Sequence, residues 1–252
     1  MSDTEHKIQT RGSEKQLAAR ANLLELFENN PLPPEQLLTN LLLFTRSSVL
    51  AKVFYLNELY QRILDKPGVI MEFGVWWGQN MVLFESLRAI YEPYNYTRRV
   101  VGFDTFTGYA SISDKDGDSD YVSDGAYSVS HDYESFLARL LNYHQQENSM
   151  PQITKYDLVK GDAGKELKEY LNKHPETIIA LAYFDMQLYK PTKECLEAIK
   201  PHLTRGSVIA MDEINSLEFP GETIALKEVW DLNKLKIIRS QFLPDRAFIV
   251  FD

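Results

Sequence analysis

Cysteine is almost absent from this sequence, in which Cys195 is the only one among 252 residues. A single cysteine excludes an intrachain disulfide framework and a cysteine-based zinc site, and it is typical of a reducing compartment. Long apolar runs are also missing, since none approaches the roughly 18 residues that a membrane-spanning helix needs. The polar N-terminal stretch lacks the apolar core of a signal peptide. We therefore expect a cytoplasmic protein without a membrane partner.

Positive charge is in deficit, with 27 Lys and Arg residues against 36 Asp and Glu residues and a net charge of −9. Binding to a phosphate backbone needs a face of Lys and Arg, so we expect no nucleic-acid partner. Hydrophobic residues make up 44% of the chain and charged residues 25%, which is typical of a globular protein. The length suffices for one large α/β domain or two small ones.

Residues 1–66 carry helical patterns. Ser13 and Gln16 form a capping-box pattern ahead of an apolar run, a pair of prolines precedes a second run, and a Pro-Gly pair follows a third. These signals predict helices over 14–29, 34–44 and 47–65. We expect them to form a helical cap, whose leucines either cover the rest of the protein or hold a homo-oligomer together.

Residues 67–252 change character, because short β-rich apolar runs alternate there with amphipathic stretches. The expected strands are 69–73, 99–103, 156–159, 178–184, 208–211, 236–239 and 247–251. The expected helices between them are 79–91, 132–147, 164–173, 191–201 and 221–230. This alternation predicts an α/β fold, a Rossmann-like seven-stranded mixed sheet with helices on both faces. The short link before the final run predicts that the last strand is antiparallel.

The first expected strand ends in Glu72-Phe73-Gly74-Val75-Trp76-Trp77-Gly78. Ligands of such sheets bind at the carboxyl ends of the strands, and glycines let the backbone approach a ligand closely. The spacing is neither G-x-G-x-x-G nor a P-loop. The carboxylate of Glu72 disfavours a diphosphate and favours cationic or hydroxyl groups. Trp76 either lines a cofactor pocket or packs in the core.

Acidic residues also follow the second and third expected strands. Asp104 either accepts hydrogen bonds from ribose hydroxyls or caps a helix. Asp162 either caps the following helix or accepts from an adenine amino group, with Ala163 supplying a backbone N–H.

The fourth and fifth expected strands end in Asp185 and in the pair Asp212-Glu213. If these strands are neighbours, the three carboxylates converge at one edge of the sheet. Oxygen ligands suit Mg²⁺, Ca²⁺ or Mn²⁺, and a cation would offset the repulsion between the carboxylates. The alternative is a helix cap, a salt bridge and an exposed acid.

Residues 104–131 lack apolar periodicity and are rich in aspartate, but they do not fit the calcium-loop pattern. Long loops in compact domains tend to be functional, so this segment is either a lid or a solvated loop. His131 near its end is the best-placed histidine for a general base, because its ordinary pKa lies near neutrality. Asp124 and Tyr127 are alternatives, as is a structural role for His131 at a helix start.

The chain resembles the class I S-adenosylmethionine-dependent methyltransferases and, more narrowly, the macrocin O-methyltransferase (TylF) family. The motifs that carry the resemblance lie within 69–215 and are Glu72-x-Gly74-Val75-Trp76-x-Gly78, Asp104-x-Phe106-x-Gly108, Asp185 with Tyr189, and Asp212-Glu213. The resemblance implies S-adenosylmethionine as cofactor and Mg²⁺ held by Asp185, Asp212 and Glu213. The candidate cofactor-binding residues are Arg46, Glu72, Gly74, Trp76, Gly78, Asp104, Asp162, Ala163 and Asp185.

The implied function is methylation of a hydroxyl on a sugar or glycosylated natural product, assisted by a divalent cation. Asp185 and His131 are the candidate catalytic residues. The sequence departs from the family pattern where Gln187 and Glu213 stand in place of aspartates. The alternatives are an NAD-dependent oxidoreductase, whose glycine spacing is not present here, and a non-catalytic cofactor-binding protein.

Overall fold

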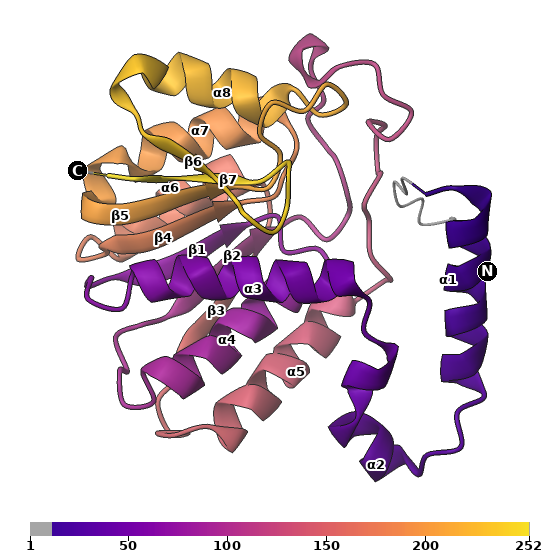
Figure 1. Ribbon diagram of the computed structural model, residues 1–252. Helices are drawn as coiled ribbons and strands as arrows, with labels where there is room; N and C mark the ends of the chain where they lie inside the picture. Colours follow the sequence, from indigo (N-terminus) through magenta and orange to yellow (C-terminus); the bar gives the residue numbers. More distant parts are fainter. Residues whose placement is uncertain (1–11, 252) are drawn as a thin grey trace.

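A seven-stranded sheet forms the centre of the computed structural model, which describes residues 12–251 (Figure 1). The strand order is β3-β2-β1-β4-β5-β7-β6. β7 is antiparallel to both of its neighbours, and the other neighbouring pairs are parallel, as predicted. The strands are β1 (Val69–Phe73), β2 (Val100–Asp104), β3 (Tyr156–Lys160), β4 (Ile179–Phe184), β5 (Leu203–Met211), β6 (Ile237–Arg239) and β7 (Ala247–Val250).

The helices cover the two faces of the sheet in two groups. Buried side chains of α3, α4 and α5 pack on one face, and those of α6, α7 and α8 pack on the other. Every residue of β1 and β4 is buried, as expected for parallel strands covered on both faces. The helices are α1 (Glu14–Glu28), α2 (Pro34–Thr39), α3 (Ser47–Arg62), α4 (Gln79–Tyr91), α5 (Tyr133–Glu147), α6 (Ala163–Lys173), α7 (Tyr189–Ile199) and α8 (Gly221–Val229).

Short 3₁₀ helices interrupt the connections. They are η1 (Leu41–Phe44), η2 (Asp114–Asp116), η3 (Lys200–His202) and η4 (Leu232–Lys234). The helix expected over 34–44 is therefore wrong in part, because α2 ends before Asn40. The side chain of Asn40 donates to the carbonyl of Gln36 at 2.7 Å and thus satisfies an end carbonyl of α2.

The N-terminal helices differ in how they meet the sheet. α1 begins at the predicted Ser13–Gln16 capping box, but α1 and α2 bury no residue, and α1 stands apart from the sheet in Figure 1. α3 instead buries Tyr55, Leu56, Leu59 and Tyr60 in the core. The division of the chain at residue 66 stays a prediction.

The strand order reverses between β1 and β4, which places a crevice at the carboxyl ends of these two strands. The turns that follow them touch, since the Asp185 amide donates to the Phe73 carbonyl at 2.8 Å. Within residues 12–251, no helix is both long and apolar enough to cross a membrane.

Candidate active site

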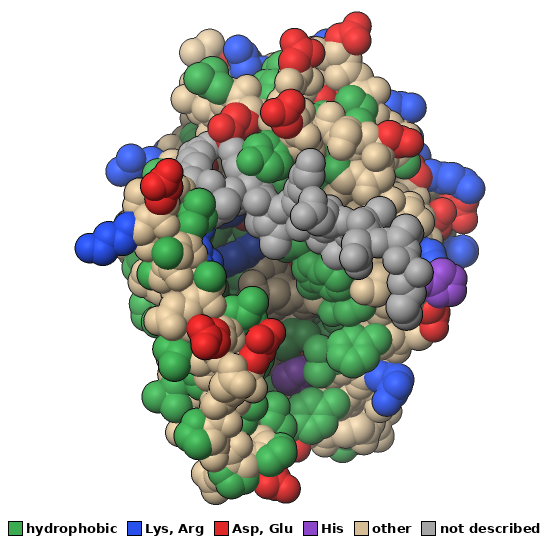
Figure 2. All heavy atoms as spheres, turned by 90° about the vertical axis from the view of Figure 1, so that its right-hand side faces the viewer, with side chains coloured by type: hydrophobic (Ala, Val, Ile, Leu, Met, Phe, Trp, Pro, Cys, Tyr) green, Lys and Arg blue, Asp and Glu red, His purple; other side chains and the backbone are tan. Residues whose placement is uncertain are grey.

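A cavity of about 600 Å³ opens at the carboxyl ends of the strands, a size typical of small-molecule sites. The turns after five strands contribute to its wall, and the 104–131 segment adds Tyr109 and Tyr127. On the side shown in Figure 2, the molecular surface is hollowed, and hydrophobic side chains gather around the hollow. The predicted site residues that line the cavity are Gly74, Trp76, Asp104, Asp162, Ala163, Asp185, Asp212 and Glu213.

The turn after β1 is shaped by glycine. Gly74 lies at φ +93°, and a Cβ there would come within 2.1 Å of the Asp185 carbonyl oxygen. This close contact between two backbones leaves no room for a side chain. Gly78 lies at φ +77° at the start of α4, where a Cβ would clash with the side chain of Leu137. The β1 turn therefore requires both glycines that the sequence motif contains.

Asp104 at the end of β2 organises this side of the cavity. Its carboxylate accepts hydrogen bonds from the backbone amides of Trp76 at 2.7 Å and Phe106 at 2.6 Å. Burial raises the pKa of Asp104, and these amides oppose that rise. Asp104 also lines the cavity, so its carboxylate can accept a hydrogen bond from a ligand there.

Aromatic side chains form one wall of the cavity. The rings of Trp76 and Tyr127 meet edge to face at 5.9 Å, and those of Tyr127 and Tyr109 lie 5.2 Å apart. Trp76 has φ +50°, an uncommon backbone conformation for a bulky residue. Its buried indole N–H has no hydrogen-bond partner in the described part of the chain. The arrangement offers both flat surfaces and a hydrogen-bond donor to a bound ring.

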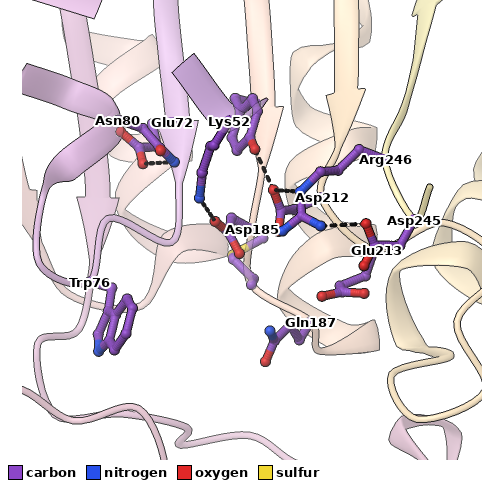
Figure 3. Close-up of polar contacts among 12 residues, drawn as sticks. Lys52, Glu72, Trp76, Asn80, Asp185, Gln187, Asp212, Glu213, Asp245 and Arg246 are labelled. Atoms are coloured by element: carbon purple, nitrogen blue, oxygen red, sulfur yellow. Dashed lines mark hydrogen bonds and ion pairs between the residues drawn. The ribbon is translucent and has the colours of Figure 1, made fainter. Parts of the chain in front are cut away.

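Glu72 is fully buried and contacts the cavity through Asn80, whose side-chain amide donates to it at 2.9 Å (Figure 3). Burial and the nearby Asp185 raise the pKa of Glu72 well above its ordinary value. Asn80, not Glu72, lines the cavity. Glu72 thus holds the side chain of Asn80 in place without itself lining the cavity.

Asp162 and Ala163 lie at the start of α6, beside the end of β3. Asp162 caps the helix, since its carboxylate accepts from the amide of Lys165 at 3.0 Å. Both residues also line the cavity, so capping and a place at the cavity wall occur together.

The ends of β4 and β5 bring the predicted carboxylates together with two cations (Figure 3). The Lys52 ammonium from α3 lies 3.5 Å from Asp185. Arg246, from the β6–β7 connection, grips Asp212 with Nε at 2.9 Å and Nη2 at 2.5 Å. The hydroxyl of Tyr183 also donates to Asp212.

The charges at this end explain the pKa shifts. Burial and Asp212 raise the pKa of Asp185 to about 6, and Lys52 opposes the rise. Burial would also raise the pKa of Asp212, but Lys52 and Arg246 outweigh it and lower that pKa. The two carboxylates in turn raise the pKa of Lys52 against the effect of burial. Lys52 and Arg246 therefore face Asp185 and Asp212, and Arg246 also pairs with Asp245 at 2.5 Å.

Glu213 completes the acidic group but differs in charge. Burial, followed by repulsion from Asp212, raises its pKa to about 8, so it is mostly protonated at neutral pH. Asp212 is already engaged by Arg246 and Tyr183. Within residues 12–251 no three acidic, histidine or cysteine side chains are arranged to hold a metal ion. The donor set in this arrangement does not fit a divalent cation.

Four predicted site residues are not among the described residues that line the cavity: Glu72, Gly78, Arg46 and His131. Arg46 is exposed ahead of α3 and donates to Ser48 at 3.0 Å. His131 is exposed in the turn before α5, outside the described residues that line the cavity. The sheet brings the other members of the predicted set together because they follow strand ends.

Sequence reasoning missed Lys52 and Arg246. Lys52 had a signal, because it lies one helical turn before the buried Tyr55 and Leu56 and so interrupts the apolar stripe of α3. Arg246 had none, since it lies in an irregular connection and meets Asp212 only through the pairing of β5 with β7.

Known proteins resemble the chain over most of its length. The family model described as macrocin-O-methyltransferase (TylF) matches residues 52–236. A solved structure of CalS11, a calicheamicin methyltransferase, is 38% identical with a TM-score of 0.93 and covers 99% of both chains. An apo structure of CalS11, titled TDP-rhamnose 3′-O-methyltransferase, is 38% identical with a TM-score of 0.85 and covers 96% of both chains.

A more distant likeness shows the fold alone. The O-methyltransferase NovP is 16% identical, with a TM-score of 0.60 over 80% of this chain and 79% of its own. A search of curated protein sequences gave no match.

Proposed function

We propose, because the chain belongs to the macrocin-O-methyltransferase (TylF) family, that it methylates a hydroxyl of a deoxysugar carried on a nucleotide or a glycosylated natural product. Membership makes it a methyltransferase of the S-adenosylmethionine-dependent type. The nucleotide-linked sugar is supported by CalS11, which is described as a TDP-rhamnose 3′-O-methyltransferase. When bound, the cofactor supplies an activated methyl group. The observation that carries the proposal is the ionised Asp185 beside Lys52 at the cavity.

The end of the cavity at β1, β2 and β3 suits the cofactor, and we name it the cofactor end. Asp104 accepts from the ribose hydroxyls, and Asp162 with the amide of Ala163 binds the adenine edge. The glycines of the β1 turn let the backbone approach the methionine part, with Glu72 holding Asn80 in place. The assignments are supported by the cavity wall that these residues share and by the position of the Asp104 carboxylate in it.

The end at β4 and β5 suits the sugar, and we name it the acceptor end. Asp185 accepts the proton of the acceptor hydroxyl, because a pKa of about 6 leaves it ionised at neutral pH yet able to bind a proton. The Lys52 ammonium at 3.5 Å from Asp185 offsets the negative charge that develops on the acceptor oxygen. Because His131 lies outside the described residues that line the cavity, we assign the role of general base to Asp185.

Magnesium is a separate expectation, and no step of the proposal depends on it. A divalent cation at Asp212 would have to displace Arg246, whose guanidinium already binds both carboxylate oxygens. The positive charge that a metal would provide is present in Lys52 and Arg246.

Expectations outside the cavity stay predictions. The cytoplasmic location and the absence of a nucleic-acid partner have support only from composition. A homo-oligomer is supported by the exposed leucines of the N-terminal region, which include Leu24, Leu26, Leu38, Leu42 and Leu43. Light scattering on the purified chain measures the oligomeric state directly.

Ligand-dependent thermal unfolding tests the cofactor. S-adenosylhomocysteine at 100 times its Kd should stabilise the fold by about 2.7 kcal/mol, which raises Tm by roughly 5–11 °C in a domain of this size. A shift with NAD⁺ instead would favour the oxidoreductase. If neither ligand changes the Tm of a folded sample free of retained cofactor, the result would favour a non-catalytic protein that binds a different ligand.

Mass spectrometry tests the reaction. Incubation with S-adenosylmethionine and a nucleotide-linked deoxysugar should add one methyl group to the sugar. Loss of the addition in Asp185→Asn, with binding of S-adenosylhomocysteine retained, supports the proposed role of Asp185. An unchanged rate in that variant contradicts it.

A further inference from the structure

The turn between β4 and α7 carries both Asp185 and Gln187, and carboxylates from other segments hold its backbone. Glu222 of α8 accepts from the amides of Met186 at 2.9 Å and Gln187 at 2.8 Å. Asp116 accepts from the amide of Tyr189 at 2.5 Å. Both acids are fully buried. The shape of the turn at the acceptor end therefore depends on residues distant in sequence.

Asp116 supplies what α7 lacks locally. The first amides of a helix have no partner within the helix, and the residue that precedes α7 is Leu188, which makes no side-chain cap. The carboxylate of Asp116 binds the first amide of α7 in its place. A negative charge at a helix N-terminus also interacts favourably with the helix dipole.

Asp116 belongs to the acidic 104–131 segment but differs from its acidic neighbours. Asp114, Asp118 and Asp120 are exposed, whereas Asp116 is fully buried. Its carboxylate also accepts from the amide of Ser113 at 2.6 Å and the hydroxyl of Ser113 at 2.9 Å. A buried carboxylate needs such partners, so Asp116 is stable in this place only while the segment lies against α7.

Packing around Asp116 is close. A Cβ at Gly221, at the start of α8, would lie 2.4 Å from the Asp116 carboxylate and 2.6 Å from the Tyr189 amide. On the solvent side, Lys115 pairs with Glu228 at 2.5 Å and lies 4.1 Å above the ring of Tyr189. The outer pair is exposed and contributes little. The buried carboxylate is therefore the main attachment.

The same segment forms part of the cavity wall. The hydroxyl of Tyr109 donates to the side-chain oxygen of Gln187, and both residues line the cavity. The 104–131 segment thus meets the turn between β4 and α7 at Asp116 on the outside of the cavity and at Tyr109 and Tyr127 on the inside.

We propose that Asp116 is a positioning residue that fastens the 104–131 segment over the acceptor end, so that Tyr109, Gln187 and Asp185 take their places together. The identity of the acceptor rests on the proposed function, but the attachment does not. When the segment is attached in only a fraction of the molecules, the apparent affinity for the acceptor falls by the same fraction.

Hydrogen exchange of the Tyr189 amide tests the attachment without any enzyme assay. In the wild-type chain this amide should exchange slowly, although it is the first of its helix. In Asp116→Ala it should exchange at least about tenfold faster, while amides in the middle of α7 stay protected. Asp118→Asn, an exposed acid two residues further on, is the matched control and should behave as wild type.

Kinetics separate a positioning role from a purely structural one. In Asp116→Ala we expect the KM for the sugar acceptor to rise about tenfold, with the Kd of S-adenosylhomocysteine changed less than about threefold. Asp116→Asn keeps one acceptor oxygen and should lie between wild type and Asp116→Ala. Asp118→Asn should keep wild-type values.

Several outcomes would overturn the inference. A fast-exchanging Tyr189 amide in the wild type would show that Asp116 does not hold it. Fast exchange in Asp116→Ala with an unchanged acceptor KM would reduce Asp116 to a structural cap. If Asp116→Ala does not fold, hydrogen exchange of the Tyr189 amide in the wild type and the acceptor KM of Asp116→Asn still test the inference. Failure of the proposed function would instead remove methyl transfer from the wild type while leaving the slow exchange intact.

Discussion

The cofactor end of the cavity is shaped by backbone, whereas the acceptor end is shaped by charged side chains. At the cofactor end, Gly74 touches the neighbouring turn and Asp104 binds two amides. At the acceptor end, Asp185 and Asp212 are balanced by Lys52 and Arg246. A change at the cofactor end should therefore alter ligand binding. A change at the acceptor end should alter charge, proton transfer and stability.

This difference agrees with what the two proposed ligands require. A nucleoside-containing cofactor is recognised by shape and by a few hydrogen bonds, which a rigid turn and one carboxylate supply. An acceptor hydroxyl must lose a proton during transfer, which needs a carboxylate whose charge is tuned by its neighbours.

The largest expected effect is on catalysis. Asp185→Asn removes the proposed base and should lower kcat by roughly 10²–10⁴-fold, while the Kd of S-adenosylhomocysteine stays within a few fold. Steady-state kinetics and calorimetry measure the two quantities. Equal losses in both would show that Asp185 serves the cofactor end.

The pH profile sharpens the same assignment. Because the pKa of Asp185 is about 6, kcat/KM should fall as the pH drops through that value and the base becomes protonated. A profile without a limb near pH 6, measured with saturating cofactor, would argue against Asp185 as the base.

The next effect is on stability. Arg246→Met leaves Asp212 buried without its main partner, which costs about 3–5 kcal/mol and lowers Tm by roughly 6–20 °C. The double variant Arg246→Met with Asp212→Asn should recover much of the loss, since position 212 then carries no buried charge, and Asp245, which also pairs with Arg246, is partly exposed. Calorimetry on wild type, both single variants and the double variant gives the coupling. Additive losses would contradict the pairing.

A smaller effect is expected at the cofactor end. Asp104→Asn places a side-chain NH₂ group against one of the two backbone N–H groups that Asp104 binds, so that two donors face each other. The binding of S-adenosylhomocysteine should weaken by roughly 10–100-fold. Asp124→Asn, an exposed acid of the 104–131 segment, is the matched control. If Asp104→Asn weakened the binding of the sugar acceptor alone, the assignment of the two ends would be reversed.

A further effect concerns the pH dependence of stability at Glu213. Its folded pKa of about 8 exceeds its ordinary value of 4.5, so the folded chain keeps a proton between these values that the unfolded chain has lost. Stability contributed by the protonated group is thus present below about pH 4.5 and is lost as the pH rises to about 8. Tm of the wild type should fall relative to Glu213→Gln across this window and then run parallel to it. A constant difference would show an ordinary pKa.

The extent to which the sequence predicted the site differs between the two ends. The motif from Glu72 to Gly78 and the aspartate that ends β2 were found because turn chemistry is local. The carboxylates of the acceptor end were found as well, since each follows a strand. Their partners were missed, and a metal ion was expected in place of Lys52 and Arg246.

The order of strands and helices along the chain and the α/β class follow from the sequence pattern alone. Alternation of apolar runs with amphipathic stretches allows few other arrangements. The sequence pattern also placed acidic residues at strand ends. The cations that neutralise them, and the burial of Asp116 in the 104–131 segment, depend on the three-dimensional packing. Those contacts join residues far apart along the chain, and their energies depend on burial, which a linear pattern does not contain.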